Sequence, residues 1–445
     1  MSKVDFPLLV ARAVRNVSSI PSSAPSAGVT GHSLLRPDGS LGPVASLVDG
    51  LLLAALEQEA SDIHIEPADA GQSLRIRLRV DGFLRPVPGL EETIPRLILP
   101  NLINRLKVMS HLDTTERRLP QDGRFSFTAD WSGKGEITVD VRVSVIPVLW
   151  GEKVVLRLLN LLSTRRLECL DLSPDNEGII RRWCRLSGGL VLVTGPVGSG
   201  KTTTLYGVLS ELDAATRNIV TVEDPVECAI DGINQMAADE DYLTFPRALR
   251  AVLRQDPDVV LVGEIRDEET AEIAVRAALT GRLILSTLHT NDAVGAVIRL
   301  LEMGIKPYLL AATLAGAMGQ RLLRRLCSDC REEYLPEEDS PEGVFIRKVP
   351  GNRENDDKRF YRPVTGNRQC PVCGGSGYHG RIPVHELLPV SEELSGAIAR
   401  GAGVKELREI AAAGGFKSMA ADGIEKAAAG LTTIAEVERS LYGMV

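Results

Sequence analysis

The sequence has no apolar run that approaches the ~20 residues a helix needs to cross a bilayer. The most apolar candidate, residues 308–318, is too short and is broken by Gly316. The first residues, MSKVDFPLLVARAVRN, lack the long apolar core and the small-residue cleavage site of a secretory signal. We therefore expect a protein without a membrane span that stays in the cytoplasm.

Cysteine is scarce, with seven residues in the chain, and a cytoplasmic location keeps thiols reduced. Four of the seven form a C-x2-C…C-x2-C pattern: Cys327, Cys330, Cys370 and Cys373. Two tight pairs of thiolates are typical of a closed, tetrahedral zinc site, so the spacing predicts one structural Zn²⁺. The other three are expected to be buried thiols without a metal: Cys169, Cys184 and Cys228.

The chain also lacks an excess of basic residues. Its 51 Lys and Arg against 59 Asp and Glu give a net charge of −8, which disfavours a broad nucleic-acid-binding surface. Aromatic residues are only 4% of the chain and do not alternate with basic residues as in single-strand binding proteins. The remaining composition, 44% hydrophobic and 25% charged over 445 residues, is that of a globular protein of two to four domains.

What the sequence does contain is a phosphate-binding loop. Within LVLVTGPVGSGKTTTLY, residues 190–206, an apolar strand leads into a glycine-rich turn and then a helix. Glycines let backbone N–H groups converge on phosphate oxygens, Lys201 can reach the β and γ phosphates, and the Thr202 hydroxyl can bind Mg²⁺. The predicted nucleotide-binding residues are Gly195, Pro196, Val197, Gly198, Ser199, Gly200, Lys201 and Thr202.

Further apolar strands follow at 219–222, 259–262 and 283–285, separated by helical stretches, an order that predicts a parallel sheet with helices on both faces. The first two end in the acidic segments EDPVE and GEIRD, and carboxyl ends of parallel strands meet at one edge. The carboxylates expected to hold Mg²⁺ and to orient a water are Glu223, Glu227 and Glu264. The sequence leaves open which of them activates the water.

The fourth strand runs into STLHTND, which places His289 beside these carboxylates, where an imidazole can sense or polarise a γ phosphate. Upstream, Arg157 interrupts the apolar run VVLRLL, and a buried guanidinium needs an anion as a partner. His64, in SDIHIEP, has no such neighbours in sequence, and its role is open.

Periodicity outlines the rest of the chain. Helical spacing at 44–59 and 97–112 and period-2 alternation at 74–80 and 137–145 predict a small α+β domain. The first 45 residues are rich in Ser, Pro and Gly and read as linker. We expect five regions: a segment and linker at 1–45, an α+β domain at 46–160, a nucleotide domain at 161–325, a zinc module at 326–380 and a helical region at 381–445.

Taken together, the motifs resemble those of the secretion superfamily ATPases, in particular the type II secretion and type IV pilus assembly ATPases. The resemblance runs from Ala60 to the end of the chain. It rests on the phosphate loop, TVEDPVE, LVGEIRD and STLHTNDA in family order, on SDIHIEP, RVDG, RLPQDGR and DVRVSVIP before them, and on GQRLLRRLC, both CxxC pairs and DGIEKAAAGLTT after them. Larger members have a separate N-terminal docking domain before the part that this sequence resembles.

The resemblance implies an α/β RecA-like P-loop NTPase domain with a parallel sheet, preceded by a PAS-like α+β domain and followed by a zinc module and a helical tail. It implies a homo-hexamer that hydrolyses ATP with Mg²⁺ at the cytoplasmic face of the inner membrane and drives a platform protein that extracts pilin-like subunits. It also implies that Arg142 and Arg157 reach the γ phosphate from the N-terminal domain.

Three alternatives remain. A pilus retraction ATPase is an alternative within the family, although such proteins lack the paired cysteines. A RecA-like DNA translocase or helicase shares the broad fold, but the acidic charge disfavours it and no nucleic-acid partner is expected. A scaffold with a degenerate site is disfavoured by intact Lys201, Thr202 and Glu264. Whether the product is a pilus, a secretion pseudopilus or a DNA-uptake filament stays open.

Overall fold

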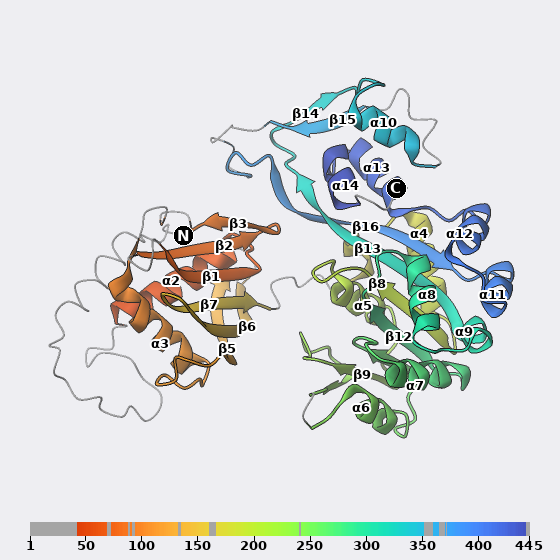
Figure 1. The fold of residues 1–445 in the computed structure, drawn as a ribbon, viewed down its shortest axis with the longest axis horizontal. Coiled ribbons are helices and arrows are strands. Elements are labelled where there is room, and N and C mark those ends of the chain that lie inside the picture. Colours follow the sequence, from red (N-terminus) through yellow and green to blue (C-terminus); the bar gives the residue numbers. More distant parts are fainter. Residues whose placement is uncertain are drawn as a thin grey trace. The chain divides into compact units, whose positions relative to one another are not determined.

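The computed structural model describes residues 42–68, 73–87, 90, 94–131, 135–159, 166–239, 242–350, 359–364, 370 and 372–441. All but the last few residues of the predicted linker, 1–45, lie outside this set. The chain divides into two compact units, Met1–Ser163 and Thr164–Val445, and each is described by itself (Figure 1). The finer division of the second unit into three regions stays a prediction.

The first unit is built on an antiparallel sheet with the strand order β3-β2-β1-β7-β6-β5, and β4 also pairs with β2. Its elements are α2 (Pro43–Glu57), β1 (Asp62–Ala68), β2 (Ser73–Val80), β3 (Phe83–Pro86), β4 (Ile94–Pro95), α3 (Leu99–Met109), β5 (Gln121–Trp131), β6 (Gly135–Val148) and β7 (Gly151–Leu158). The predicted helices and alternating strands are therefore confirmed, with small shifts at their ends.

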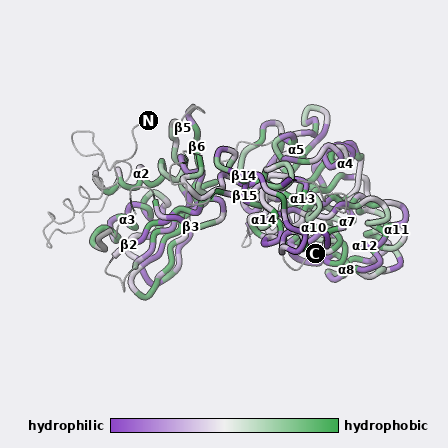
Figure 2. The backbone as a smooth tube through the Cα atoms, turned by 90° about the horizontal axis from the view of Figure 1, so that it is seen from above, coloured by the Kyte–Doolittle hydropathy of each residue, from purple (hydrophilic) through white to green (hydrophobic). Residues whose placement is uncertain are grey.

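One face of this sheet is covered by α2 and α3, which lie together beside the strands (Figure 1). On β2 the side chains of Leu74, Ile76 and Leu78 are buried, while the arginines between them are exposed or half-buried. Figure 2 shows the corresponding alternation of hydrophobic and hydrophilic residues along the strands. The other face of the sheet therefore carries polar and charged side chains.

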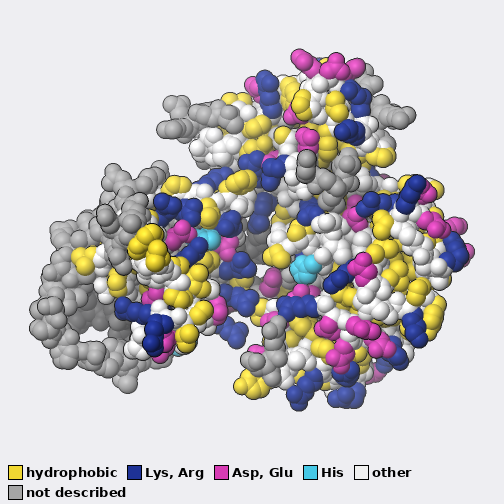
Figure 3. All heavy atoms as spheres, in the orientation of Figure 1, with side chains coloured by type: hydrophobic (Ala, Val, Ile, Leu, Met, Phe, Trp, Pro, Cys, Tyr) yellow, Lys and Arg dark blue, Asp and Glu magenta, His cyan; other side chains and the backbone are white. Residues whose placement is uncertain are grey.

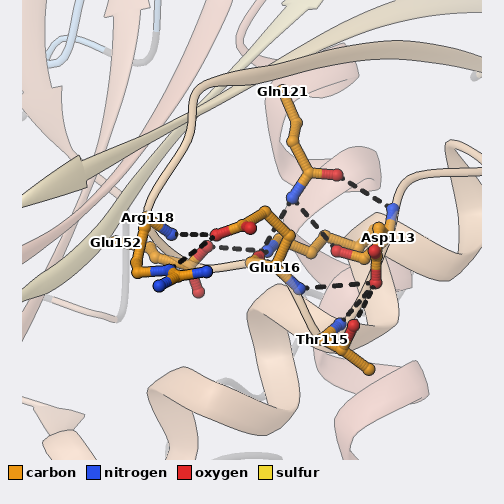
Figure 4. Close-up of polar contacts among 7 residues, drawn as sticks. Asp113, Thr115, Glu116, Arg118, Gln121 and Glu152 are labelled. Atoms are coloured by element: carbon orange, nitrogen blue, oxygen red, sulfur yellow. Dashed lines mark hydrogen bonds and ion pairs between the residues drawn. The ribbon is translucent and has the colours of Figure 1, made fainter.

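A buried lysine anchors the connection between α3 and β5. The Lys107 side chain is fully buried, its Nζ lies 2.7 Å from Glu152 Oε1, and it donates to the Glu116 carbonyl oxygen at 2.6 Å. Gln121 donates to the same carbonyl at 3.1 Å, and Asp113 Oδ1 accepts from the Thr115 backbone N–H at 2.7 Å (Figure 4). These contacts connect residues 113–121 to Lys107 of α3, which in turn pairs with Glu152 of β7.

The second unit contains a mixed sheet with the strand order β10-β9-β11-β12-β8-β13-β16. All neighbouring pairs are parallel except β13 and β16, which are antiparallel. The strands are β8 (Gly189–Thr194), β9 (Ile219–Glu223), β10 (Asn234–Ala237), β11 (Val259–Val262), β12 (Leu283–Leu288), β13 (Leu314–Leu326) and β16 (Tyr378–Pro389). The predicted parallel sheet is confirmed, and three strands at its two edges, β10, β13 and β16, are additions to the prediction.

Helices cover both faces of this sheet, as the sequence predicted. Leu190 and Leu192 of β8 face a core that includes α6 (Phe245–Val252), α7 (Glu268–Leu279), α8 (Ala293–Glu302), α9 (Pro307–Thr313), α11 (Glu392–Ala399) and α12 (Val404–Ala413). Val191 and Val193 face the opposite core, with α4 (Pro174–Cys184) and α5 (Lys201–Leu209). Because successive β8 side chains enter different cores, the strand is apolar throughout.

β13 and β16 continue as a two-stranded ribbon beyond the other strands (Figure 1). Around it lie β14 (Arg331–Tyr334), β15 (Phe360–Pro363), α10 (Pro341–Lys348), α13 (Met419–Ala428) and α14 (Ile434–Ser440). The last helix is tied to the ribbon by Glu436, whose carboxylate pairs with Arg324 of β13 and with Arg439. A cysteine cluster lies at the end of the ribbon. Helices follow from Glu392 onward, whereas residues 381–389 of the predicted helical region form part of β16.

Candidate functional site

The glycine-rich loop joins β8 to α5 with three glycines at positive φ. These values are 154° at Gly195, 79° at Gly198 and 88° at Gly200, a region that side chains with a Cβ adopt rarely. A Cβ on Gly195 would also collide with the Gln320 carbonyl oxygen. The loop therefore needs glycine both for its backbone and for its close approach to β13.

The loop fits a phosphate group as its ligand. No side chain caps the N-terminus of α5 in the described structure, so its first amides stay available to an anion. The Ser199 hydroxyl is buried without a hydrogen-bond partner among the described residues. An unsatisfied hydroxyl beside an uncapped helix N-terminus suits phosphate oxygens.

Lys201 folds over this loop. Its Nζ donates to the carbonyl oxygens of Gly195 at 2.8 Å and Pro196 at 3.1 Å. Burial lowers the pKa of Lys201, while the charge of Glu264 opposes that shift. A partly desolvated ammonium whose shortest contacts are neutral carbonyls is well suited to exchange them for phosphate oxygens.

A chain of polar contacts crosses the ends of three strands. Lys201 Nζ lies 3.5 Å from His289 Nδ1, and His289 Nε2 lies 3.1 Å from Glu264 Oε2. Glu264 Oε1 lies 2.5 Å from a guanidinium nitrogen of Arg266. Since Lys201 can only donate, Nδ1 accepts and Nε2–H donates to the carboxylate. The structure thus brings Lys201, His289 and Glu264 together at the carboxyl edge of the sheet.

The charge state of Glu264 follows from its neighbours. Burial raises the pKa of Glu264, but hydrogen bonds from Arg266 and His289 outweigh burial and leave the pKa below its usual range. The carboxylate is therefore ionised at neutral pH, with only a minor part of its side chain exposed. An ionised carboxylate beside a phosphate-binding loop can accept a hydrogen bond from a water or help to hold Mg²⁺.

The other two predicted carboxylates lie around a tyrosine instead. Glu223 is buried and accepts hydrogen bonds from Tyr206 at 2.5 Å, Thr221 at 2.5 Å and Gln235 at 3.2 Å. The backbone N–H of Glu227 donates a hydrogen bond to the same Tyr206 hydroxyl. Burial and the neighbouring carboxylate raise the pKa of Tyr206 far above its usual range. Glu223 thus connects β9 to α5. Within the described part of the chain, no hydrogen bond joins it to the Lys201–His289–Glu264 group.

The four paired cysteines converge, although 39 residues separate the two CxxC pairs in sequence. All four Sγ atoms lie within 4.8 Å of one another, with Cys327 and Cys370 at 3.8 Å and Cys330 and Cys373 at 3.5 Å. A tetrahedral Zn²⁺ with Zn–S bonds of ~2.3 Å places its sulfurs about 3.8 Å apart, so the cluster fits zinc. The Gly377 backbone N–H also donates to Cys373 Sγ at 3.3 Å, as amides do around bound thiolates.

The three remaining cysteines differ from one another. Cys184 is buried and Cys228 half-buried, but Cys169 is exposed. The expectation of burial is therefore wrong for Cys169, which precedes a left-handed turn at Asp171 on the surface.

The two arginines that were predicted to reach the γ phosphate lie on the polar face of the sheet in the first unit. Arg142 on β6 is opposite Arg157 on β7, and Arg124 on β5 is opposite Arg142. Arg157 is 59% exposed, so the expectation that it is buried is wrong; it meets an anion nonetheless, because its Nε lies 3.0 Å from Asp62 Oδ1. Figure 3 shows basic side chains recurring on the visible face of this unit. VVLRLL is a half-buried strand whose polar positions face outward.

Sequence reasoning missed two residues of the site. Arg266 pairs with Glu264, and its place in the segment GEIRD two residues after that glutamate was a usable signal. Gln320 on β13 contacts Ser199 of the loop from 121 residues away, and nothing local in GQRLL indicates this.

With this geometry established, comparisons place the chain among known proteins. A family model described as type II/IV secretion system protein matches residues 38–439. The chain belongs to this family. The Vibrio cholerae type II secretion system ATPase E is 46% identical over 399 residues, covering 89% of this chain and 75% of the relative. The Thermus thermophilus type IV pilus assembly ATPase PilB is 43% identical over 395 residues, covering 88% of this chain and 42% of that one.

Solved structures agree with the fold of this secretion family. The Legionella pneumophila ATPase DotB gives a TM-score of 0.63 at 21% identity, covering 88% of this chain and 95% of that one. The pilus retraction motor PilT with bound ADP gives a TM-score of 0.55 at 24% identity, covering 87% of this chain and 95% of that one. Among the described residues, no helix is long and apolar enough to cross a membrane.

Proposed function

We propose that this chain is an ATP-hydrolysing motor of a type II secretion or type IV pilus assembly machine. The observation that carries the proposal is the contact of Lys201, His289 and Glu264 beside an uncapped glycine-rich loop, in a chain of the secretion family. A retained lysine and an ionised carboxylate at this loop favour turnover over a scaffold with a degenerate nucleotide site.

In the proposed reaction, loop amides and Lys201 bind the β and γ phosphates of ATP. Glu264 orients a water in line with the γ phosphorus, and His289 holds that carboxylate and faces the phosphate. The water oxygen forms the new P–O bond as the bond to ADP breaks, and the proton of the water goes to phosphate. Thr202 would hold Mg²⁺, and the ion would supply charge neutralisation when bound.

The first unit contributes Arg142 and Arg157 to the γ phosphate in this proposal. Both side chains are exposed, and a guanidinium fork matches phosphate oxygens in a bidentate way. Contacts that depend on the γ phosphate draw the units together when ATP binds and release them after hydrolysis. Zn²⁺ at Cys327, Cys330, Cys370 and Cys373 is structural, because protein fills all four positions.

We further propose a homo-hexamer that acts at the cytoplasmic face of the inner membrane on a platform protein. The support is family membership and similarity to the type II secretion ATPase E and PilB relatives. A retraction motor shares the fold, but the converging cysteines favour assembly or secretion. Proposed association with the membrane is peripheral.

The test compares activators of the purified full-length chain. Its ATP hydrolysis is measured alone, with the cytoplasmic region of a platform protein, and with single- or double-stranded DNA. The platform region is expected to raise the rate at least several-fold and DNA to leave it unchanged. Activation by DNA alone would overturn the proposal in favour of a translocase.

A further inference from the structure

Gln320 of β13 makes two buried contacts with the nucleotide-binding segment. Its Nε2 donates to the Ser199 carbonyl oxygen at 2.7 Å, and its Oε1 accepts from the Thr204 hydroxyl at 2.6 Å. Gln320 is 2% exposed and Thr204 is fully buried. One amide thus holds both the loop and the first turn of α5.

The roles of the two amide atoms are determined by the partners. A backbone carbonyl can only accept, so the NH₂ group must face Ser199, and the carbonyl oxygen must then face Thr204. Each partner supplies the complement, and the side chain has no freedom to rotate without breaking a buried hydrogen bond.

The Ser199 carbonyl and the Gly200 N–H belong to one peptide group, and the orientation of that group determines where the Gly200 N–H points. In a planar trans peptide, the C=O of one residue and the N–H of the next point in opposite directions. With the Ser199 oxygen held toward Gln320, the Gly200 N–H is directed to the side of the loop away from β13. Amides of this loop are its anion-binding groups, so their direction decides whether the loop is ready for phosphate.

The loop cannot hold this plane by itself. Gly198 and Gly200, on either side of Ser199, have φ of 79° and 88°, and glycine lets the backbone adopt other conformations at little cost. The approach from β13 is close, since a Cβ on Gly200 would lie 2.9 Å from Gln320 Nε2. An external anchor for this plane is therefore needed, and Gln320 is in contact with it.

We infer that Gln320 is a positioning residue for nucleotide binding, which fixes the Ser199–Gly200 peptide so that the loop amides meet the phosphates. This inference rests on the proposed function. It also connects the ribbon to the nucleotide, because β13 runs from Gln320 to Leu326, the residue before Cys327 of the cysteine cluster. Gln320 acts on the ground state and the transition state alike, so its loss raises KM and leaves kcat.

The experiment measures ATP and ADP affinity, KM and kcat for the full-length chain and its variants. Gln320→Glu keeps the shape but places an acceptor against the Ser199 oxygen, and Gln320→Leu removes both hydrogen bonds. Each variant is expected to weaken ATP and ADP binding about 10-fold or more and to raise KM equally, with kcat within about threefold.

Two matched controls separate positioning from stability. Leu323→Ala, a fully buried position on the same strand, should lower the unfolding temperature without changing KM. Thr204→Val removes only the hydrogen bond from Thr204 to Gln320 and should raise KM several-fold. Thr204→Ser keeps the hydroxyl and should have the KM of the wild type. If the Gln320 variants do not fold, the two Thr204 variants still test whether Gln320 positions the loop.

The inference is overturned if folded Gln320 variants bind ATP like the wild type, if Leu323→Ala raises KM to the same extent, or if Thr204→Val and Thr204→Ser are equal. A wild-type chain that binds no nucleotide would instead overturn the proposed function, and this inference with it.

Discussion

Arg157 on β7 and Asp62 on β1 face each other across neighbouring strands, with Nε 3.0 Å from Oδ1. The same carboxylate lies 3.5 Å from Arg79, so one anion serves two guanidinium groups. Arg142 follows in register with Arg157 and has no ion-pair partner among the described residues. Arg124, Arg142 and Arg157 therefore form a row of like charges across β5, β6 and β7. Like charges directly opposite each other destabilise a sheet, so this row lowers the stability of the unit unless a further anion binds it.

The first prediction follows from that row. Arg142→Ala and Arg157→Ala should each reduce ATP hydrolysis by roughly 10³-fold, as loss of an arginine finger does, and leave nucleotide affinity within a few-fold. Steady-state turnover and equilibrium binding of ATP measure the two effects. Arg75→Ala, at an exposed arginine of β2, is the matched control and should stay near wild type. Normal turnover in both finger variants would show that these arginines serve only as surface charges worth under ~1 kcal/mol.

A second prediction concerns zinc. Elemental analysis should find one zinc per chain in the wild type and none in Cys370→Ser, because all four ligands are needed for a closed site. Since metal binding contributes folding free energy, removing it should lower the unfolding temperature of the second unit by roughly 5–10 °C. Cys169→Ser, at an exposed cysteine, should change neither value. A fully folded wild-type chain without metal would refute the assignment.

The buried pair in the first unit gives a third prediction. Lys107→Met leaves Glu152 buried without its 2.7 Å partner and should destabilise this unit by about 3–5 kcal/mol. The double variant Lys107→Met/Glu152→Leu removes both charges and should lose clearly less free energy of unfolding than the single variant. The stability of both variants is measured by urea unfolding, with hydrogen exchange of the backbone amides in α3 and β7 as the readout.

The surface pair of Arg118 and Glu116 serves as the control for that experiment. Arg118 is 90% exposed and lies 3.7 Å from the carboxylate, so Arg118→Ala should cost under ~0.5 kcal/mol. Equal losses in the single and double variants of the buried pair would contradict the explanation by an unpaired charge.

Glu436 gives a prediction about pH. Burial raises the pKa of this carboxyl, but hydrogen bonds and charges from Arg324 and Arg439 outweigh burial and lower the pKa from 4.5 to about 2. The folded state therefore binds the proton less readily than the unfolded state. Its stabilisation is fully present above pH ~4.5 and is lost as pH falls toward ~2.

The matching measurement compares the unfolding free energy of Glu436→Gln and the wild type at several pH values. The wild type should be more stable by about 2–3 kcal/mol at pH 7, and the difference should shrink steadily below pH 4.5. A difference that stays constant down to pH 2.5 would mean that the variant loses packing rather than charge.

Local patterns in the sequence predicted much of this fold. Period-2 alternation at 74–80 and helical spacing at 44–59 report burial of one face, and both elements form within a few residues of the expected bounds. The apolar strand before Gly195 and the helix after it gave the loop its context. The cysteine spacing likewise anticipated a cluster that the structure brings together.

Other features depend on contacts that no local pattern encodes. β13 carries arginines among its leucines, because its end forms a ribbon with β16 rather than a buried strand, so it was not recognised. The exposure of Arg157 depends on which face α2 and α3 cover. The hydrogen bond of Glu223 depends on Tyr206, which reaches it from α5, and no local pattern in either segment encodes that contact.

The most direct test of the central claim is ATP binding and hydrolysis by the purified full-length wild type, Lys201→Ala and Glu264→Gln, measured side by side. Lys201→Ala should lose nucleotide binding, since it removes the cation of the loop. Glu264→Gln should bind ATP normally and hydrolyse it about 10²–10⁴-fold more slowly, since a neutral amide cannot orient and polarise the attacking water as the carboxylate does. Wild-type hydrolysis by Glu264→Gln, or no hydrolysis by the wild type with its platform partner present, would contradict the account.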